Sequence, residues 1–96
     1  MSIEFSSVHN HLERQVFDTV TAMAEGYPGL NGDGELLADV ACVALNRLPP
    51  RYIRNPVDFA FYLTDVERAR MDRKVRLAVA QAFEFVQARV ALGARA

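Results

Sequence analysis

Hydrophobic side chains recur at helical spacing in the first third of the chain. Their positions are Leu12, Val16, Val20 and Met23. Steps of three and four residues place such side chains on one face of a helix. Asn10 and Glu13 have the N-x-x-E spacing of a capping box, so we expect the helix to begin there. The glycines and the proline within residues 26–34 predict a turn-rich loop after it.

A second apolar stretch, residues 35–46, has hydrophobic side chains in nearly every direction. This pattern predicts a central helix that is covered on most sides, with Cys42 buried as a small hydrophobic residue. Asp39 is its one charge after Glu35. Burying a carboxylate is costly unless it is paired, so we expect Asp39 to hold an arginine or backbone N–H groups beyond the helix.

Two prolines, Pro49 and Pro50, end the second helix and predict an extended segment over residues 48–53. Asn55 and Pro56 can cap and open a short helix. A short strand is the alternative, because Phe59, Phe61 and Leu63 alternate with other residues. The pattern leaves both interpretations open.

The longest helix is predicted to begin at the T-x-x-E capping box of Thr64 and Glu67 and to end near Arg89. Its apolar stripe consists of Val75, Val79, Ala82, Phe83, Val86 and Val90. This spacing resembles a two-helix seam, which would suit an interface between two subunits.

These elements predict an all-α fold, a small helical domain of about three main helices with a Pro-Pro turn. The chain of 96 residues is long enough for one domain. We place it at residues 8–92, with a flexible N-terminus at 1–7 and a tail at 93–96. A chain this short buries a modest share of its surface, and 51% of its residues are apolar, so we expect a homodimer.

Charge is distributed unevenly along the chain. Residues 1–64 carry eight acidic and four basic side chains, whereas residues 65–96 carry four and seven. The asymmetry permits a local basic patch although the net charge is −1. A single cysteine, no signal-peptide pattern and no apolar run of membrane-spanning length favour a cytoplasmic protein without a membrane partner.

Enzyme motifs are missing from the sequence: there is no nucleophile elbow, P-loop or dinucleotide fingerprint. His9, His11 and Glu13 lie close together, but solvated residues near a chain end are the simpler interpretation than a metal site. We therefore expect neither catalysis nor a metal ion.

The most distinctive segment is L-N-R-L-P-P-R-Y at residues 45–52. Its prolines restrict the backbone, and arginine side chains can stack on a planar base and bind phosphate with a fork of donors. The alternative is that the prolines only end a helix while the arginines form surface ion pairs. The candidate ligand-binding residues are Asn46, Arg47, Leu48, Pro49, Pro50, Arg51, Tyr52 and Arg54.

A second basic cluster opens the last helix, at Arg68, Arg70, Arg73, Lys74 and Arg76. Such a run is usually a solvated helix face, and here acidic neighbours partly neutralise it. The sequence around this cluster contains no helix-turn-helix or other known DNA-binding motif, so we expect no nucleic-acid partner.

The pattern D-V-x-x-x-A-L-N-x-L-P-P-R-Y at residues 39–52 resembles the late competence development ComFB family, and the likeness extends over roughly residues 8–90. The resemblance implies a small helical homodimer without catalytic activity. It also implies a signalling role, because similar proteins have been described as receptors for cyclic di-GMP. The positions that carry the resemblance are Asn46, Leu48, Pro49, Pro50, Arg51 and Tyr52.

The sequence departs from the family where many members carry a C-x-C-x-x-C cluster suited to structural zinc. Residues 32–36 contain no cysteine here, and Cys42 follows the Asp-Val pair. We therefore expect no cofactor and no zinc. The expected function is cyclic dinucleotide binding, with cyclic di-GMP first. The alternative is a dimeric protein–protein interaction module without a nucleotide ligand, with a protein effector as its partner.

Overall fold

A computed structural model describes residues 2–93 of the chain. Within this range the helices are α1 (Leu12–Met23), α2 (Gly34–Arg47), α3 (Pro56–Tyr62) and α4 (Asp65–Ala91), with a 3₁₀ turn at Ala24–Gly26. Two short strands, β1 (His9–Asn10) and β2 (Tyr52–Ile53), pair antiparallel, with His9 opposite Ile53. The expectation of a mostly helical domain is confirmed, and the small sheet is an addition that the hydrophobic pattern did not predict.

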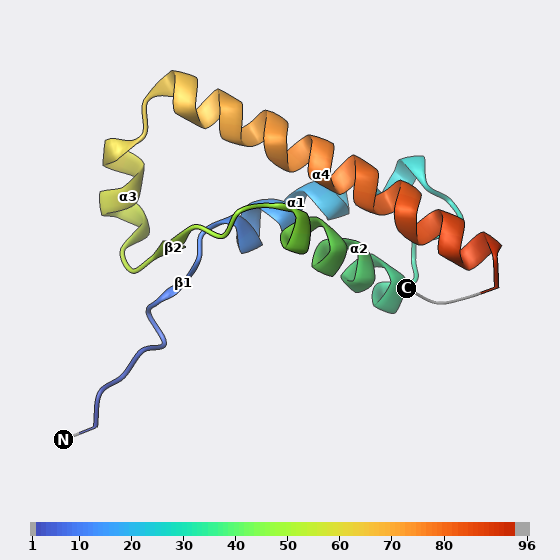
Figure 1. The fold of residues 1–96 in the computed structure, drawn as a ribbon, viewed down its shortest axis with the longest axis horizontal. Coiled ribbons are helices and arrows are strands. Elements are labelled where there is room, and N and C mark those ends of the chain that lie inside the picture. Colours follow the sequence, from blue (N-terminus) through green and yellow to red (C-terminus); the bar gives the residue numbers. More distant parts are fainter. Residues whose placement is uncertain (1, 94–96) are drawn as a thin grey trace.

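The core lies between α1, α2 and the C-terminal part of α4, which pack side by side (Figure 1). Its largest fully buried side chains are Phe83, Leu30, Val16, Val40, Val75, Val79 and Val86. The Tyr27 ring stacks on Phe83 at a centroid distance of 4.2 Å. The apolar stripe of α4 therefore fills the interior of a single chain, except at Val90, which is exposed. This stripe is not available as the subunit seam that its spacing resembled.

Asn10 lies before α1, and its side chain binds two backbone N–H groups. Its Oδ1 atom accepts the N–H of Leu12 at 3.1 Å and the N–H of Arg51 at 3.1 Å. The helix itself begins at Leu12, with His11 as its N-cap residue. Besides its expected contact with the start of α1, Asn10 thus holds the segment after α2, which is 41 residues away in the sequence.

Helix α2 is capped by Asp33, whose side chain accepts the N–H groups of Glu35 and Leu36. The helix is less enclosed than expected, because one side faces solvent. Cys42 is exposed, so the prediction that it is buried was wrong. The reason is geometric: Cys42 lies two positions from the buried Val40, and two residues turn a helix by about 200°.

Asp39 does not make the contact expected of it. The side chain is half-buried, and no hydrogen bond or ion pair joins it to another residue of the described chain. Partial access to water replaces the pairing that full burial would have required.

The segment after the prolines, for which the sequence left helix and strand open, is a helix. Residues 56–62 form the helix α3, and the Asn55 side chain caps it by accepting the N–H groups of Val57 and Asp58. Thr64 caps α4 by accepting the N–H of Glu67 at 3.1 Å, as its capping box predicted. Helix α3 and the first turns of α4 project beyond the three packed helices (Figure 1).

Candidate functional site

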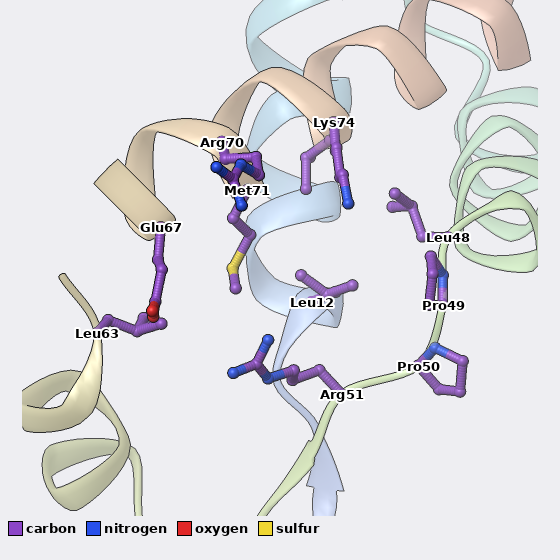
Figure 2. A pocket seen from close by; sticks show the side chains of 11 residues that line it. Leu12, Leu48, Pro49, Pro50, Arg51, Leu63, Glu67, Arg70, Met71 and Lys74 are labelled. Atoms are coloured by element: carbon purple, nitrogen blue, oxygen red, sulfur yellow. The ribbon is translucent and has the colours of Figure 1, made fainter. Parts of the chain in front are cut away.

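A cleft of about 510 Å³ lies between the prolines, the start of α1 and the N-terminal half of α4 (Figure 2). Its lining residues come from segments that are far apart in the sequence. They are Leu12, Leu48, Pro49, Pro50, Arg51, Leu63, Glu67, Arg70, Met71, Lys74 and Val75.

The wall formed by residues 48–51 is fixed at both ends. Leu48 is buried in the core. At the other end, the N–H of Arg51 donates to Asn10 Oδ1, and the carbonyl of Arg51 accepts the N–H of His11 at 2.7 Å. Because two prolines lie between these anchors, the backbone of this wall has little freedom to move.

The opposite wall is one face of α4. Glu67, Arg70, Met71, Lys74 and Val75 follow one another in steps that keep them on the same side of a helix. Figure 2 shows Met71 and Lys74 reaching from α4 toward Leu12, with Arg51 on the other side of the cleft. A side-chain hydrogen bond of 2.6 Å from Gln15 Nε2 to Asp72 Oδ1 joins α4 to α1 beside this face.

The lining of the cleft combines positively charged side chains with apolar ones. Arg51, Arg70 and Lys74 supply three cations, and Glu67 supplies one carboxylate, so the lining has an excess of two positive charges. The remaining lining residues are Met71, two prolines and aliphatic side chains. This arrangement suits an anionic ligand that also carries an apolar or planar body.

Arg51 also contacts helix α3. Its guanidinium carbon lies 5.0 Å from the centroid of the Phe59 ring, and that ring lies 4.5 Å from the ring of His11 at a tilt of 59°. Burial lowers the pKa of His11 below its usual value, and the positive charges of His9 and Arg51 lower it further. The neutral imidazole is therefore favoured beside the Arg51 guanidinium.

The structure brings together half of the residues predicted for the site. Leu48, Pro49, Pro50 and Arg51 line the cleft. The other four, Asn46, Arg47, Tyr52 and Arg54, are exposed and do not line it.

Arg47 lies against a different part of α4. Its guanidinium carbon is 5.4 Å from the centroid of Phe85, and that of Arg89 is 5.7 Å from the same ring. The Asn46 amide donates to the carbonyl of Cys42 within α2 at 3.0 Å. Tyr52 pairs with Asn10 in the sheet and exposes its side chain.

The residues that sequence reasoning missed come from α4. The sequence predicts a separate, solvated face for the basic cluster of residues 68–76, yet Arg70 and Lys74 line the cleft together with Arg51. A signal was present, because Glu67, Met71 and Lys74 are spaced by four and three residues. The spacing alone does not show that this face of α4 points toward residues 48–51.

Residues 2–93 hold no group of three or more His, Cys, Asp or Glu side chains arranged to bind a metal ion. Across the same residues, no helix has the length and apolar character needed to cross a bilayer.

Comparison with known proteins identifies the family. Neither the curated proteins nor the solved structures include a match to the chain. The family model described as late competence development protein ComFB matches residues 9–90, which include both strands, all four helices of the described chain except the last residue of α4, and every residue that lines the cleft. The chain therefore belongs to the ComFB family.

Proposed function

We propose that this protein is a non-enzymatic regulatory protein that binds a cyclic dinucleotide, cyclic di-GMP first, in the cleft between residues 48–51 and α4. The observation that carries the proposal is the convergence of Arg51, Arg70 and Lys74 on one concave surface whose other lining residues are mostly apolar. Family membership supports a regulatory role, and the resemblance of the L-N-R-L-P-P-R-Y segment to cyclic di-GMP receptors supports the choice of ligand.

The chemistry of the cleft matches the parts of such a ligand. A cyclic dinucleotide has two phosphates and two planar bases. Guanidinium and ammonium groups bind phosphate through charge-assisted hydrogen bonds, and arginine can also stack on a base. The cleft volume of about 510 Å³ lies within the range of small-molecule pockets, roughly 300–1,000 Å³.

Rigidity supports the proposal as well. Binding is weakened by the cost of ordering mobile segments. Residues 48–51 are held by a buried leucine, two prolines and the hydrogen bonds of Arg51 to Asn10 and His11. The cleft wall is therefore formed before a ligand arrives.

Isothermal titration calorimetry with cyclic di-GMP and cyclic di-AMP at physiological salt tests this function. We expect saturable binding of cyclic di-GMP, with GMP as a control that contributes one phosphate and one base. Arg51→Ala should weaken binding by about 1.5–3 kcal/mol if its guanidinium makes a charged hydrogen bond to phosphate. Arg47→Ala is the matched control, because Arg47 is exposed and lies outside the cleft. Absence of heat with either dinucleotide would remove the proposal.

A second candidate function is a dimeric protein–protein interaction module that has no nucleotide ligand. The apolar side chains that α3 exposes favour it, since large exposed apolar patches mark interaction sites. This function predicts an association state that cyclic di-GMP and cyclic di-AMP leave unchanged, together with no binding heat for either.

A further inference from the structure

We propose that Glu67 makes the cleft select guanine over adenine, because its carboxylate accepts hydrogen bonds from a guanine base of the ligand. The inference rests on the proposed dinucleotide-binding function and names the residue that determines base specificity in the same site. Among the described residues that line the cleft, Glu67 is the one acid beside the bases Arg51, Arg70 and Lys74. A carboxylate repels phosphate, so its presence in a phosphate-binding cleft requires a different partner.

The carboxylate of Glu67 has no hydrogen-bond or ion-pair partner within residues 2–93. Arg70 and Lys74 lie on the same face of α4, yet neither forms an ion pair with it in the described chain. The Glu67 N–H donates to Thr64 Oγ1. In a complete capping box the Glu67 side chain would also accept the Thr64 N–H, and the described residues do not form this second bond. The exposed carboxylate is therefore free to bind another molecule.

Glu67 lies at one end of the cleft. Figure 2 shows its side chain extending from the first turn of α4 toward Leu63, whereas Lys74 lies further along the helix, on the side of Leu48. The seven positions between Glu67 and Lys74 correspond to about 10.5 Å along a helix axis. Arg70 comes between them on the same helix. The cleft thus offers a hydrogen-bond acceptor at one end and phosphate-binding donors toward the other.

Guanine and adenine differ at the edge that such an acceptor contacts. Guanine presents two neighbouring donors on its Watson–Crick edge, the ring N1–H and the amino group on C2. Adenine presents one donor there, the amino group on C6, beside the lone pair of N1. An ionised carboxylate only accepts hydrogen bonds. Its two oxygens therefore pair with both guanine donors, whereas with adenine one of them faces an electron-rich nitrogen.

Apolar side chains beside Glu67 supply a surface on which the base can lie. Met71 follows Glu67 by one helical turn, Leu63 immediately precedes the cap of α4, and both line the cleft. Met71 is half-buried and packs against the core, so its position is supported. Methionine sulfur makes favourable contacts with aromatic rings. A base that packs on Met71 and Leu63 directs its edge to the carboxylate of Glu67.

Calorimetry of the full chain with cyclic di-GMP and cyclic di-AMP measures this selection as the ratio of the two dissociation constants. For the wild type we expect cyclic di-GMP to bind roughly 5-fold to 150-fold more tightly. Glu67→Gln replaces one acceptor with an amide donor, which matches the donor and the acceptor of adenine. This variant should therefore prefer cyclic di-AMP. Glu67→Ala should lose the preference for cyclic di-GMP without acquiring the opposite one.

Asp65→Asn is the matched control, because Asp65 is an exposed carboxylate in the same first turn of α4 that does not line the cleft. It removes the same negative charge close to an anionic ligand, so it should strengthen the binding of both dinucleotides alike and leave their ratio unchanged. A purely structural role of Glu67 would also change both affinities together. Circular dichroism establishes that each variant keeps its helices. If Glu67→Gln and Glu67→Ala do not fold, Glu67→Asp, which withdraws the carboxylate by one methylene group, should reduce the ratio.

Three results would overturn the inference and leave dinucleotide binding in place. The first is a wild-type protein that binds the two dinucleotides equally or prefers cyclic di-AMP. The second is a ratio that the substitutions of Glu67 do not change. The third is an Asp65→Asn variant whose ratio shifts as much as that of Glu67→Gln. Absence of heat with either dinucleotide would instead remove the proposed function itself, and the selection by Glu67 with it.

Discussion

The guanidinium of Arg51 lies 5.0 Å over the ring of Phe59. This contact joins a wall of the cleft to the inner side of α3, because Arg51 lines the cleft and Phe59 anchors the helix. A phosphate that draws the Arg51 side chain toward the cleft would therefore compete with the attachment of α3.

The first prediction concerns the anchor of α3. Phe59→Ala removes a ring pair and a cation–π contact, which contribute about 0.5–1.5 kcal/mol and about 0.5–1 kcal/mol in typical cases. We expect faster amide hydrogen exchange over residues 56–62, with the core of α1 and α2 unchanged. Phe61→Ala, on the opposite side of the helix, is the control. Equal exchange in the two variants would show that Phe59 does not hold α3.

Asn10 carries the second prediction. Its Oδ1 atom accepts two backbone N–H groups, those of Leu12 and Arg51. Asn10→Ala leaves both without this acceptor, and each hydrogen bond contributes about 0.5–1.5 kcal/mol. We expect urea denaturation to show a loss of about 1–3 kcal/mol in the free energy of unfolding, together with weaker binding of cyclic di-GMP.

Asn46→Ala is the matched control for Asn10→Ala. The Asn46 amide bonds only within α2, to the carbonyl of Cys42, and the residue is exposed. Its replacement should change stability by less than about 0.5 kcal/mol, as for most surface substitutions. If the two variants lose the same stability, the link from Asn10 to Arg51 contributes nothing.

A third prediction follows from the lowered pKa of His11. In the unfolded chain this imidazole takes up a proton near its usual pKa of about 6.5, whereas in the folded chain it does so only at lower pH. The unfolded state therefore binds more protons between the two values, and the stability falls as the pH is lowered through this window. Urea denaturation at a series of pH values measures the effect.

His11→Phe isolates the contribution of His11 protonation to the pH dependence of stability, because the variant keeps a ring beside Phe59 and cannot titrate. We expect its stability to fall less than that of the wild type as the pH drops below about 6.5. If the stability of the wild type and that of His11→Phe change in parallel with pH across this window, burial does not lower the pKa of His11.

The fourth prediction tests the place of the α4 stripe in the core. Val79 is fully buried inside the single chain. Val79→Asp places an unpaired carboxylate in an apolar core, at a cost of several kcal/mol, so we expect loss of the helical circular dichroism signal. Val90→Asp, at the exposed end of the same stripe, should fold. A well-folded monomeric Val79→Asp variant would instead make the stripe an interface.

Local signals allowed much of the fold to be predicted. The caps at Asn55 and Thr64 have the hydrogen bonds that their sequence spacing implied. The prolines ended α2 as expected. These features depend on neighbours within four residues, which a sequence displays directly. The burial predicted for Cys42 was wrong. When most positions of a helix are apolar, the sequence pattern does not show which side faces solvent.

The cleft depended on contacts that a single sequence does not display. Arg51 and Lys74 line the same cleft because Asn10 joins the proline segment to α1 and Gln15 joins α1 to Asp72 on α4. Each link joins residues more than 40 positions apart. The sequence pattern located residues 48–51 as a rigid wall, but it did not reveal which basic residues face them.

We propose that the cleft, and not the basic surface of α4 as a whole, binds the dinucleotide. Arg70 lines the cleft, whereas Arg73 is an exposed arginine three positions further along the same helix that does not. Calorimetric titration of cyclic di-GMP into Arg70→Ala and Arg73→Ala is the most direct measurement. We predict that Arg70→Ala weakens binding by about 1.5–3 kcal/mol, roughly 10-fold to 150-fold, and that Arg73→Ala binds as the wild type does. Equal losses in the two variants would contradict the account.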